Sequence, residues 1–151
     1  MKKFHSKKEK KMKDLKYKLL DPSMPTPEFK TAGSACFDLH VAEDVELLPG
    51  RGVLISTGLA FEPPEGYHIE IYMRSSMCRR GITGPTGIVD NDYRGEVKVQ
   101  AMNLSDTALT ICKYDRIAQA RLVKDVPTTL VPVAELSKTE RGEKGFGSTG
   151  R

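Results

Sequence analysis

The sequence has no tryptophan, and its 151 residues include few cysteines or histidines, three of each. Cys36, Cys78 and Cys112 are odd in number and show no C-x-x-C spacing, which excludes a disulfide framework and a cysteine-based zinc site. The histidines form no H-x-x-x-H pair either. If a metal ion takes part, oxygen ligands and bound phosphates have to supply its coordination.

The sequence also lacks any run of about eighteen apolar residues, the length that a membrane-spanning helix requires. Its first segment, MKKFHSKKEKKMKDLKYKLL, is positively charged but lacks the apolar stretch of a secretory signal. We therefore expect a cytoplasmic protein that makes no contact with a membrane. A chain of 151 residues, 38% hydrophobic and 29% charged, predicts a single globular domain.

The positive charge is confined to one end of the chain. The formal net charge is +4, but residues 1–18 hold nine lysines against Glu9 and Asp14, which leaves the other 133 residues at −3. A basic face for duplex DNA over the whole domain is therefore excluded. We predict a mobile Lys-rich extension over residues 1–16. Two roles are open for it: a solvated leader that aids solubility, or an electrostatic tether for nucleic acid or another polyanion.

Short segments rich in β-branched and aromatic residues alternate with Gly and Pro from Leu19 onward. Residues 66–73 and 97–101 alternate apolar and polar side chains with period two, which is typical of half-buried strands. The only short helix that we predict covers Ser75–Arg80, capped by Ser75 and ended by Gly81. The pattern predicts an all-β fold, an antiparallel sandwich or barrel over residues 17–136.

The last segment, SKTERGEKGFGSTGR, covers residues 137–151 and has too few apolar residues to join a core. Extended, it reaches roughly 45 Å, enough to cross onto a neighbouring subunit. A frayed terminus is the alternative. Gly142 and Gly147 have the separation of a P-loop, but Ser148 stands where that motif requires Lys, so a Walker-type NTPase is excluded.

Two further motifs carry polar groups suited to phosphate chemistry. Arg74-Ser75-Ser76 combines an arginine with two hydroxyl groups after a predicted strand, although such a triplet can also be only a helix cap. In GIVDNDYRGE, residues 87–96, Asp90 and Asp92 flank Asn91. This spacing alone favours ordinary turn chemistry, and the alternative is a carboxylate that acts as general base toward water.

Five motifs in order connect these features: TAGSACFDL (31–39), MRSSM (73–77), GIVDNDYRGE (87–96), DRIAQ (115–119) and RGEKGFGSTG (141–150). The series resembles the five motifs of the homotrimeric dUTP diphosphatases, the dUTPase family, from about residue 17 to 151. The third and fifth motifs are the most specific.

The resemblance implies a jelly-roll-like β-fold that assembles as a homotrimer, with three active sites built between subunits and a C-terminal arm, residues 137–151, that closes over a site. It implies Mg²⁺-dependent hydrolysis of dUTP to dUMP and pyrophosphate, which limits uracil in DNA and supplies dUMP for dTMP synthesis. Asp90 would be the general base, holding the water that attacks the α-phosphorus.

The resemblance also assigns the substrate contacts. Tyr93 would pack beneath the deoxyribose, and the backbone of Gly87, Ile88, Val89 and Lys98 would recognise uracil. The phosphate chain would be bound by Arg74, Ser75, Ser76 and Gln119. Asp38 would hold a water molecule of the Mg²⁺ shell. In the arm, Phe146 would stack on uracil, and Arg141 and Ser148 would hold the γ-phosphate, with Gly147 also at the substrate.

The sequence departs from the family pattern at three places: Cys36-Phe37 in the first motif, Gly84 where some members carry an Asn that touches the base, and Lys144 where Gly is common. The nearest alternative is the related dCTP deaminase, whose chemistry needs a Glu at the position of Gln100. A second alternative is a nucleotide-controlled regulatory protein, in which the Lys-rich extension binds nucleic acid.

Overall fold

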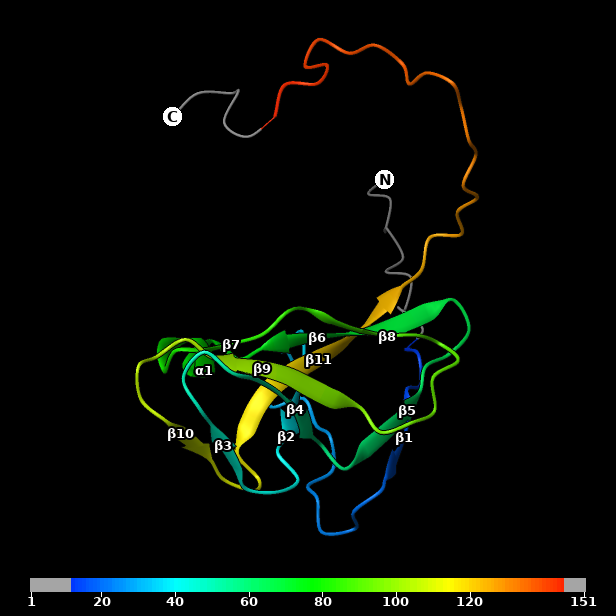
Figure 1. Cartoon of the computed structure of the whole chain (residues 1–151). Coiled ribbons are helices and arrows are strands. Elements are labelled where there is room, and N and C mark those ends of the chain that lie inside the picture. The colour runs from blue at the N-terminus through cyan, green and yellow to red at the C-terminus, as the bar shows by residue number, and fades with distance from the viewer. Residues whose placement is uncertain (1–11, 146–151) are drawn as a thin grey trace, which may run out of the picture.

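The structure, a computed structural model, describes residues 12–145. The larger sheet has four strands in the order β2 (Phe37–His40), β11 (Arg116–Lys124), β6 (Tyr67–Met73) and β8 (Gly87–Val89). A second sheet contains β4 (Gly52–Ser56), β9 (Lys98–Asn103) and β7 (Ile82–Thr83). Two strand pairs complete the fold: β1 (Lys16–Leu19) with β5 (Leu59–Glu62), and β10 (Leu109–Ile111) with β3 (Val45–Leu47). These ladders are antiparallel (Figure 1).

The core lies between the sheets and follows the alternation that the sequence predicts. In β6, Ile69 and Ile71 are buried, while His68, Glu70 and Tyr72 face outward. The fully buried side chains include Leu39, Leu47, Ile55, Ile82, Ile111 and Ile117, which come from both sheets and from the β10–β3 pair. Each contributes about 1.5–3 kcal/mol by leaving water. The all-β prediction is confirmed.

Helix α1 (Ser75–Arg79) is the one short helix among the described residues, and it directly follows β6. The predicted cap was wrong. Arg74, still extended and donating its backbone N–H to the carbonyl of Ile117, is the N-cap residue, and Ser75 already lies in the helix. Gly81 ends the helix region as predicted, because its φ of 83° suits a residue without a Cβ.

Strands β8 and β9 follow each other in the chain but do not pair. Within residues 12–145, β8 pairs with β6 alone, and β9 pairs with β4 and β7. Between them, Asp90 accepts a backbone hydrogen bond from Tyr93 at 3.2 Å, which confirms a turn at the Asp-Asn-Asp motif. The turn therefore connects two separate sheets, and residues 98–101 of β9 pair with β4 alone.

The last strand ends at Lys124, and the chain then leaves the β-domain as an extended segment (orange in Figure 1). Its apolar side chains are exposed; they are Val126, Leu130, Val131, Val133 and Leu136. The boundary between domain and arm at residues 136 and 137 stays a prediction. Phe146, Gly147 and Ser148 lie outside the described residues. In the part of the chain that the structure describes, no helix is long and apolar enough to span a membrane.

Candidate active site

Three predicted motifs meet around one carboxylate, which we name the ion-pair cluster: Asp38, Arg74 and Arg116. The Asp38 side chain is only 12% exposed, and its two oxygens lie 3.2 Å from Arg74 Nε and 3.2 Å from Arg116 Nη1. These contacts depend on strand register. Asp38 on β2 lies opposite Gln119 on β11, and Gln119 in turn lies opposite Tyr72 on β6. The structure thus brings Asp38, Arg74 and Gln119 together.

The cluster is cationic, with two guanidinium groups on one carboxylate. Ser75 and Ser76 follow Arg74 directly, Ser75 exposed and Ser76 half-buried. The environment also acts on His40 at the end of β2: burial lowers its pKa, Asp38 opposes this, and Lys30 and the two arginines lower the pKa further. His40 is therefore biased toward its neutral form, and the positive charge of the cluster comes from Arg74 and Arg116.

A tight turn before β11 places Arg116. Its Tyr114 has φ of 72°, the left-handed region that side chains rarely adopt, and Asp115 accepts a hydrogen bond from the Cys112 backbone at 3.0 Å. The carbonyl of Asp115 accepts a further bond from the Val41 backbone at 2.9 Å. The turn is thereby fixed to the end of β2, which brings the start of β11 beside Asp38.

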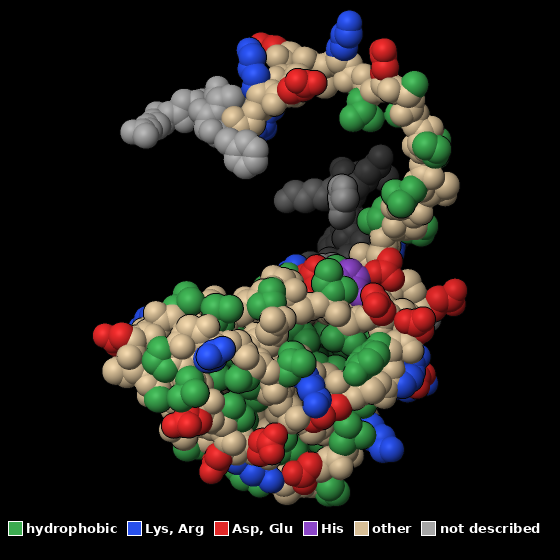
Figure 2. Space-filling model, viewed as in Figure 1, with side chains coloured by type: hydrophobic (Ala, Val, Ile, Leu, Met, Phe, Trp, Pro, Cys, Tyr) green, Lys and Arg blue, Asp and Glu red, His purple; other side chains and the backbone are tan. Residues whose placement is uncertain are grey.

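A cavity lies between β8 and β9, which we name the β8–β9 slot. It has two adjoining parts of about 330 Å³ and about 180 Å³, which share Leu54 and Lys98. The larger part is lined by Leu54, Ile88, Val89, Asp90, Tyr93, Glu96, Val97 and Lys98. The smaller part is lined by Leu54, Ile71, Met73, Pro85, Thr86, Gly87, Lys98, Val99 and Gln100. In Figure 2 the front surface is hollowed and apolar in the region between β9 and β8.

The slot is lined on both sides by strand edges. A methyl group on Gly84 would lie 2.1 Å from the carbonyl oxygen of Gln100, so this oxygen points away from β4 and toward Gly84. Alternate residues of an antiparallel strand turn their N–H and C=O groups to the same edge. The backbone of Lys98, two residues earlier, therefore also faces the slot. Gly87, Ile88, Val89 and Lys98 all line the slot.

Asp90 and Tyr93 lie at the mouth of the slot. Asp90 is exposed, and its carboxylate makes no hydrogen bond or ion pair with any described residue. The Tyr93 hydroxyl donates to the backbone carbonyl of Glu96 at 3.0 Å, and the ring lies so close to Gly95 that a methyl group there would be 2.4 Å from the hydroxyl. Tyr93 is therefore held in place, whereas the Asp90 carboxylate is free to bind a ligand.

Three residues that position this site were not assigned from the sequence: Arg116, Asn91 and Glu96. The Asn91 amide donates to the carbonyls of Pro63, Pro64 and Tyr67 at 3.2, 2.9 and 3.0 Å. The Glu96 carboxylate accepts from the Gly58 backbone at 3.0 Å and lies 3.7 Å from Lys98 Nζ. Their positions inside the third and fourth motifs indicated that these residues matter. Their contacts could not be predicted, because the partner residues lie far away in the sequence.

The cluster and the slot are separate in one chain, because no residue of the ion-pair cluster, nor Ser75, Ser76 or Gln119, lines the slot. Arg141 of the arm is described, is exposed, and donates from Nε to the Lys144 carbonyl at 3.0 Å. It contacts neither site. The structure therefore brings the predicted residues that it describes into two groups, with Arg141 in neither.

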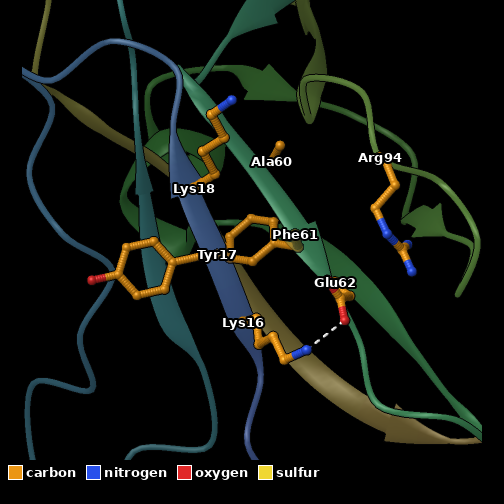
Figure 3. Close-up of a pocket in the computed structure, with 7 residues that line it drawn as sticks. All are labelled: Lys16, Tyr17, Lys18, Ala60, Phe61, Glu62 and Arg94. Atoms are coloured by element: carbon orange, nitrogen blue, oxygen red, sulfur yellow. Dashed lines mark hydrogen bonds and ion pairs between the residues drawn. The ribbon is translucent and has the colours of Figure 1, made fainter.

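A third cavity, of about 450 Å³, lies along the β1–β5 pair (Figure 3). Its lining consists of Lys16, Tyr17, Lys18, Ala60, Phe61, Glu62 and Arg94. Lys16 and Glu62 form an ion pair of 2.7 Å across the two strands, and this hydrogen bond lowers the pKa of Glu62. None of the predicted site residues lies here, and within residues 12–145 only β5 pairs with β1.

Comparison with known proteins identifies the family of the chain. The family model for dUTPase matches residues 23–150. The deoxyuridine 5′-triphosphate nucleotidohydrolase of Nautilia profundicola is 47% identical over 140 residues, which cover 91% of this chain and 99% of that protein. The enzyme of the same name from Fusobacterium nucleatum is 41% identical and matches 93% of this chain and all of that protein.

Among solved structures, the dUTPase of Staphylococcus bacteriophage 80alpha with dUpNHpp has the same fold. Its TM-score is 0.85 at 30% identity, and the match covers 93% of this chain and all of the phage chain. Motifs, fold and relatives agree over nearly the whole length, and the chain belongs to the dUTPase family.

Proposed function

We propose that the protein hydrolyses dUTP to dUMP and pyrophosphate, with Asp90 as the general base for a water molecule that attacks the α-phosphorus. The observation that carries this proposal is the Asp90 carboxylate, exposed at the mouth of the slot and without a partner among the described residues. A base has to be free to take a proton and close to the reacting water. Asp92 lines neither part of the slot.

The β8–β9 slot is the proposed site of the uracil base. Its two strand edges offer backbone N–H and C=O groups, the pattern that a flat ring with alternating donors and acceptors can pair with. Tyr93, fixed by its bond to the Glu96 carbonyl, provides an aromatic face for the deoxyribose and leaves little room for a 2′-hydroxyl group. The apolar side chains that line the slot exclude water from the edges of the base.

The ion-pair cluster is the proposed site of the phosphate chain. Arg74 pairs with Asp38 through Nε, and its guanidinium carries further N–H groups. The side chains of Ser75, Ser76 and Gln119 add neutral donors beside it. A guanidinium whose position is fixed by a carboxylate binds phosphate oxygens without first having to be ordered. Catalysis then consists largely of positioning and of offsetting negative charge.

The residues of the cluster fit a Mg²⁺ ion that arrives on the triphosphate, and do not fit one held by the protein. Asp38 is the only carboxylate in the cluster, and both of its oxygens already pair with arginines. Among residues 12–145 no group of three metal-binding side chains occurs. Asp38 would hold a water molecule of the metal shell, and the bound ion would offset charge on the phosphates.

The separation of slot and cluster in one chain supports a homotrimer in which one subunit's slot faces a neighbour's cluster. The exposed apolar residues between Val126 and Leu136 and the unpaired edge of β1 support assembly, because such features are normally covered. Arg141 and Lys144, exposed on the far part of the chain, would close on a site of another subunit together with Phe146, Gly147 and Ser148.

The decisive experiment is pyrophosphate release measured in parallel with dUTP, dTTP, dCTP and UTP, with and without Mg²⁺. We expect turnover of dUTP alone at low concentration, and loss of turnover without Mg²⁺. In ¹⁸O-labelled water the label is expected in dUMP. Label in pyrophosphate instead would contradict attack at the α-phosphorus, and deamination of dCTP would favour the alternative activity.

A truncated protein ending at Lys138 tests the arm. We expect it to keep its thermal unfolding temperature and its oligomeric state, measured by light scattering, and to lose nearly all turnover. Unfolding of the shortened protein would mean that the arm is structural.

A role of the Lys-rich extension in nucleic-acid binding stays a prediction, since residues 1–11 lie outside the described part.

A further inference from the structure

The closed end of the β8–β9 slot is formed where Gly84 meets β9. A methyl group on Gly84 would lie 2.1 Å from the Gln100 carbonyl oxygen and 3.2 Å from Met73 Cε. A backbone oxygen at that distance cannot move aside without shifting the strand. No side chain can therefore enter the slot from position 84, and any side-chain contact to a ligand at this end has to come from another residue.

Gln100 is placed to make that contact. It is exposed, it lines the smaller part of the slot, and its amide makes no hydrogen bond within residues 12–145. Its cross-strand neighbour on β4 is the apolar Leu54, and Ile71, Met73 and Pro85 line the same end. The other polar side chains of this part are Thr86 and Lys98, and Lys98 lies 3.7 Å from Glu96.

The chemistry of the base decides what an amide can do here. Uracil and thymine both carry an oxygen at C4, whereas cytosine carries an amino group there. A carboxamide donates through its nitrogen and accepts through its oxygen, whereas an ionised carboxylate can only accept. The backbone groups of Lys98 cannot change their order of donor and acceptor, so they fix how a base lies in the slot. A Gln amide beside them that presents its nitrogen to position C4 donates to an oxygen there and has no acceptor in a cytosine amino group.

We propose that Gln100 is a specificity-determining residue that donates a hydrogen bond from its carboxamide to the C4 oxygen of the base. This inference rests on the proposed function, in which the slot binds uracil. Gln100 then contributes to selection between bases that differ at C4, uracil against cytosine. It does not contribute to selection between uracil and thymine, which differ only by the methyl group at C5.

Gln100→Leu and Gln100→Glu test the inference through kcat/KM for dUTP, dTTP and dCTP. Loss of one hydrogen bond in Gln100→Leu is expected to lower kcat/KM for dUTP and dTTP alike by about 3- to 10-fold, mainly through KM. In Gln100→Glu the carboxylate opposes the C4 oxygen and accepts from the amino group of cytosine. We expect the dUTP-to-dCTP ratio of kcat/KM to fall at least 10-fold, on the order of one charge-assisted hydrogen bond.

The matched control is Met102→Leu, because Met102 lies on the same strand and the same face but lines neither part of the slot. It should leave all ratios unchanged. An unchanged dUTP-to-dCTP ratio in both Gln100 variants would overturn the inference. So would an equal loss on all three substrates, which is what a purely structural role produces.

A further variant separates this inference from the proposed function. Tyr93→Ala should raise turnover of UTP relative to dUTP if the slot holds the nucleoside. If Tyr93→Ala relaxes sugar selection while the Gln100 variants keep their base selection, only the role of Gln100 is wrong. If neither changes any ratio, the slot is not the nucleoside site and the proposed function fails with it.

Discussion

The two groups of site residues differ in how far the protein alone completes their interactions. In the ion-pair cluster, the only carboxylate is 12% exposed and has a guanidinium on each oxygen. In the β8–β9 slot, the β8 edge away from β6 and residues 98–101 on the β9 edge away from β4 have no strand partner within residues 12–145. The Asp90 carboxylate is also unpaired among these residues, and Leu54 and Ile88 are exposed. The cluster is ordered before a ligand arrives, whereas the slot is left for a ligand to complete.

The largest expected effect would come from the unpaired carboxylate of the slot. Asp90→Asn keeps shape and hydrogen bonding but removes the base, so kcat should fall by about 10²- to 10⁴-fold with little change in dUTP binding. Asp92→Asn, two residues along in the same turn, is the matched control and should change kcat little. Turnover kept in Asp90→Asn and lost in Asp92→Asn would reverse the assignment.

A smaller effect is expected in the cluster, where interactions are shared among several groups. Arg74→Met removes the guanidinium but keeps the apolar stem, and kcat/KM for dUTP should fall by about 10- to 100-fold, the value of a charged hydrogen bond. Arg79→Met, an exposed arginine in the last turn of α1, controls for net charge. Equal losses in both variants would mean that Arg74 acts only through long-range charge.

Gly84→Ala tests how rigid the backbone is at the closed end of the slot. The added methyl group would meet the Gln100 backbone oxygen at 2.1 Å, so overpacking should cost about 1–3 kcal/mol in the free energy of unfolding, measured with urea. Gly33→Ala is the control, because nothing lies within 4 Å of the added group there. Equal stability of the two variants would show that β7 moves away easily.

The smallest expected effect is on the pH dependence of stability, and it involves two histidines. His40 lies beside the cluster, and His68 lies outside both regions. A hydrogen bond from His68 to Asp125 and, less strongly, its contact with Glu70 raise the pKa of His68 above 6.5. Its stabilising contribution is present below pH 6.5 and is lost as the pH rises through the raised folded-state pKa. Burial instead lowers the pKa of His40, so its contribution is lost as the pH falls below 6.5.

Urea unfolding at pH 5.5 to 8 checks these opposite signs. His68→Gln should remove a component of stability that decreases with pH, and His40→Gln one that increases with pH. The pH profile of kcat should stay unchanged in His68→Gln, because that residue contacts neither the cluster nor the slot. Parallel shifts in both variants would contradict the two opposite environments.

The local parts of the fold could be predicted from the sequence. The alternation in β6 and β9 follows from period two, and Gly81 ends α1 because a left-handed backbone suits Gly. The cap was mispredicted for a nonlocal reason. Arg74 stays extended and bonds to the carbonyl of Ile117, about forty residues further along the chain, so Arg74 is the cap and the helix begins one residue earlier than a cap at Ser75 requires.

The site was predicted as motifs but not as an arrangement. The pairing of Asp38 with Arg116 depends on the register of β2 with β11, and no local pattern specifies it. Equally, GIVDNDYRGE predicts a turn but does not reveal that its two strands belong to different sheets. The roles of Asp90, Tyr93 and Gln119 in the reaction stay predictions that the experiments above test.

The Asn91 amide, which donates to the carbonyls of Pro63, Pro64 and Tyr67, ties the Asp90 turn to the loop between β5 and β6. If Asp90 is the general base, sequence changes in that loop are expected to alter kcat without any contact to the nucleotide. Spontaneous deamidation would be especially harmful at this position, because an aspartate there would face three oxygen lone pairs with no proton to share. The attachment of the Asp90 turn to that loop therefore depends on a single side-chain nitrogen.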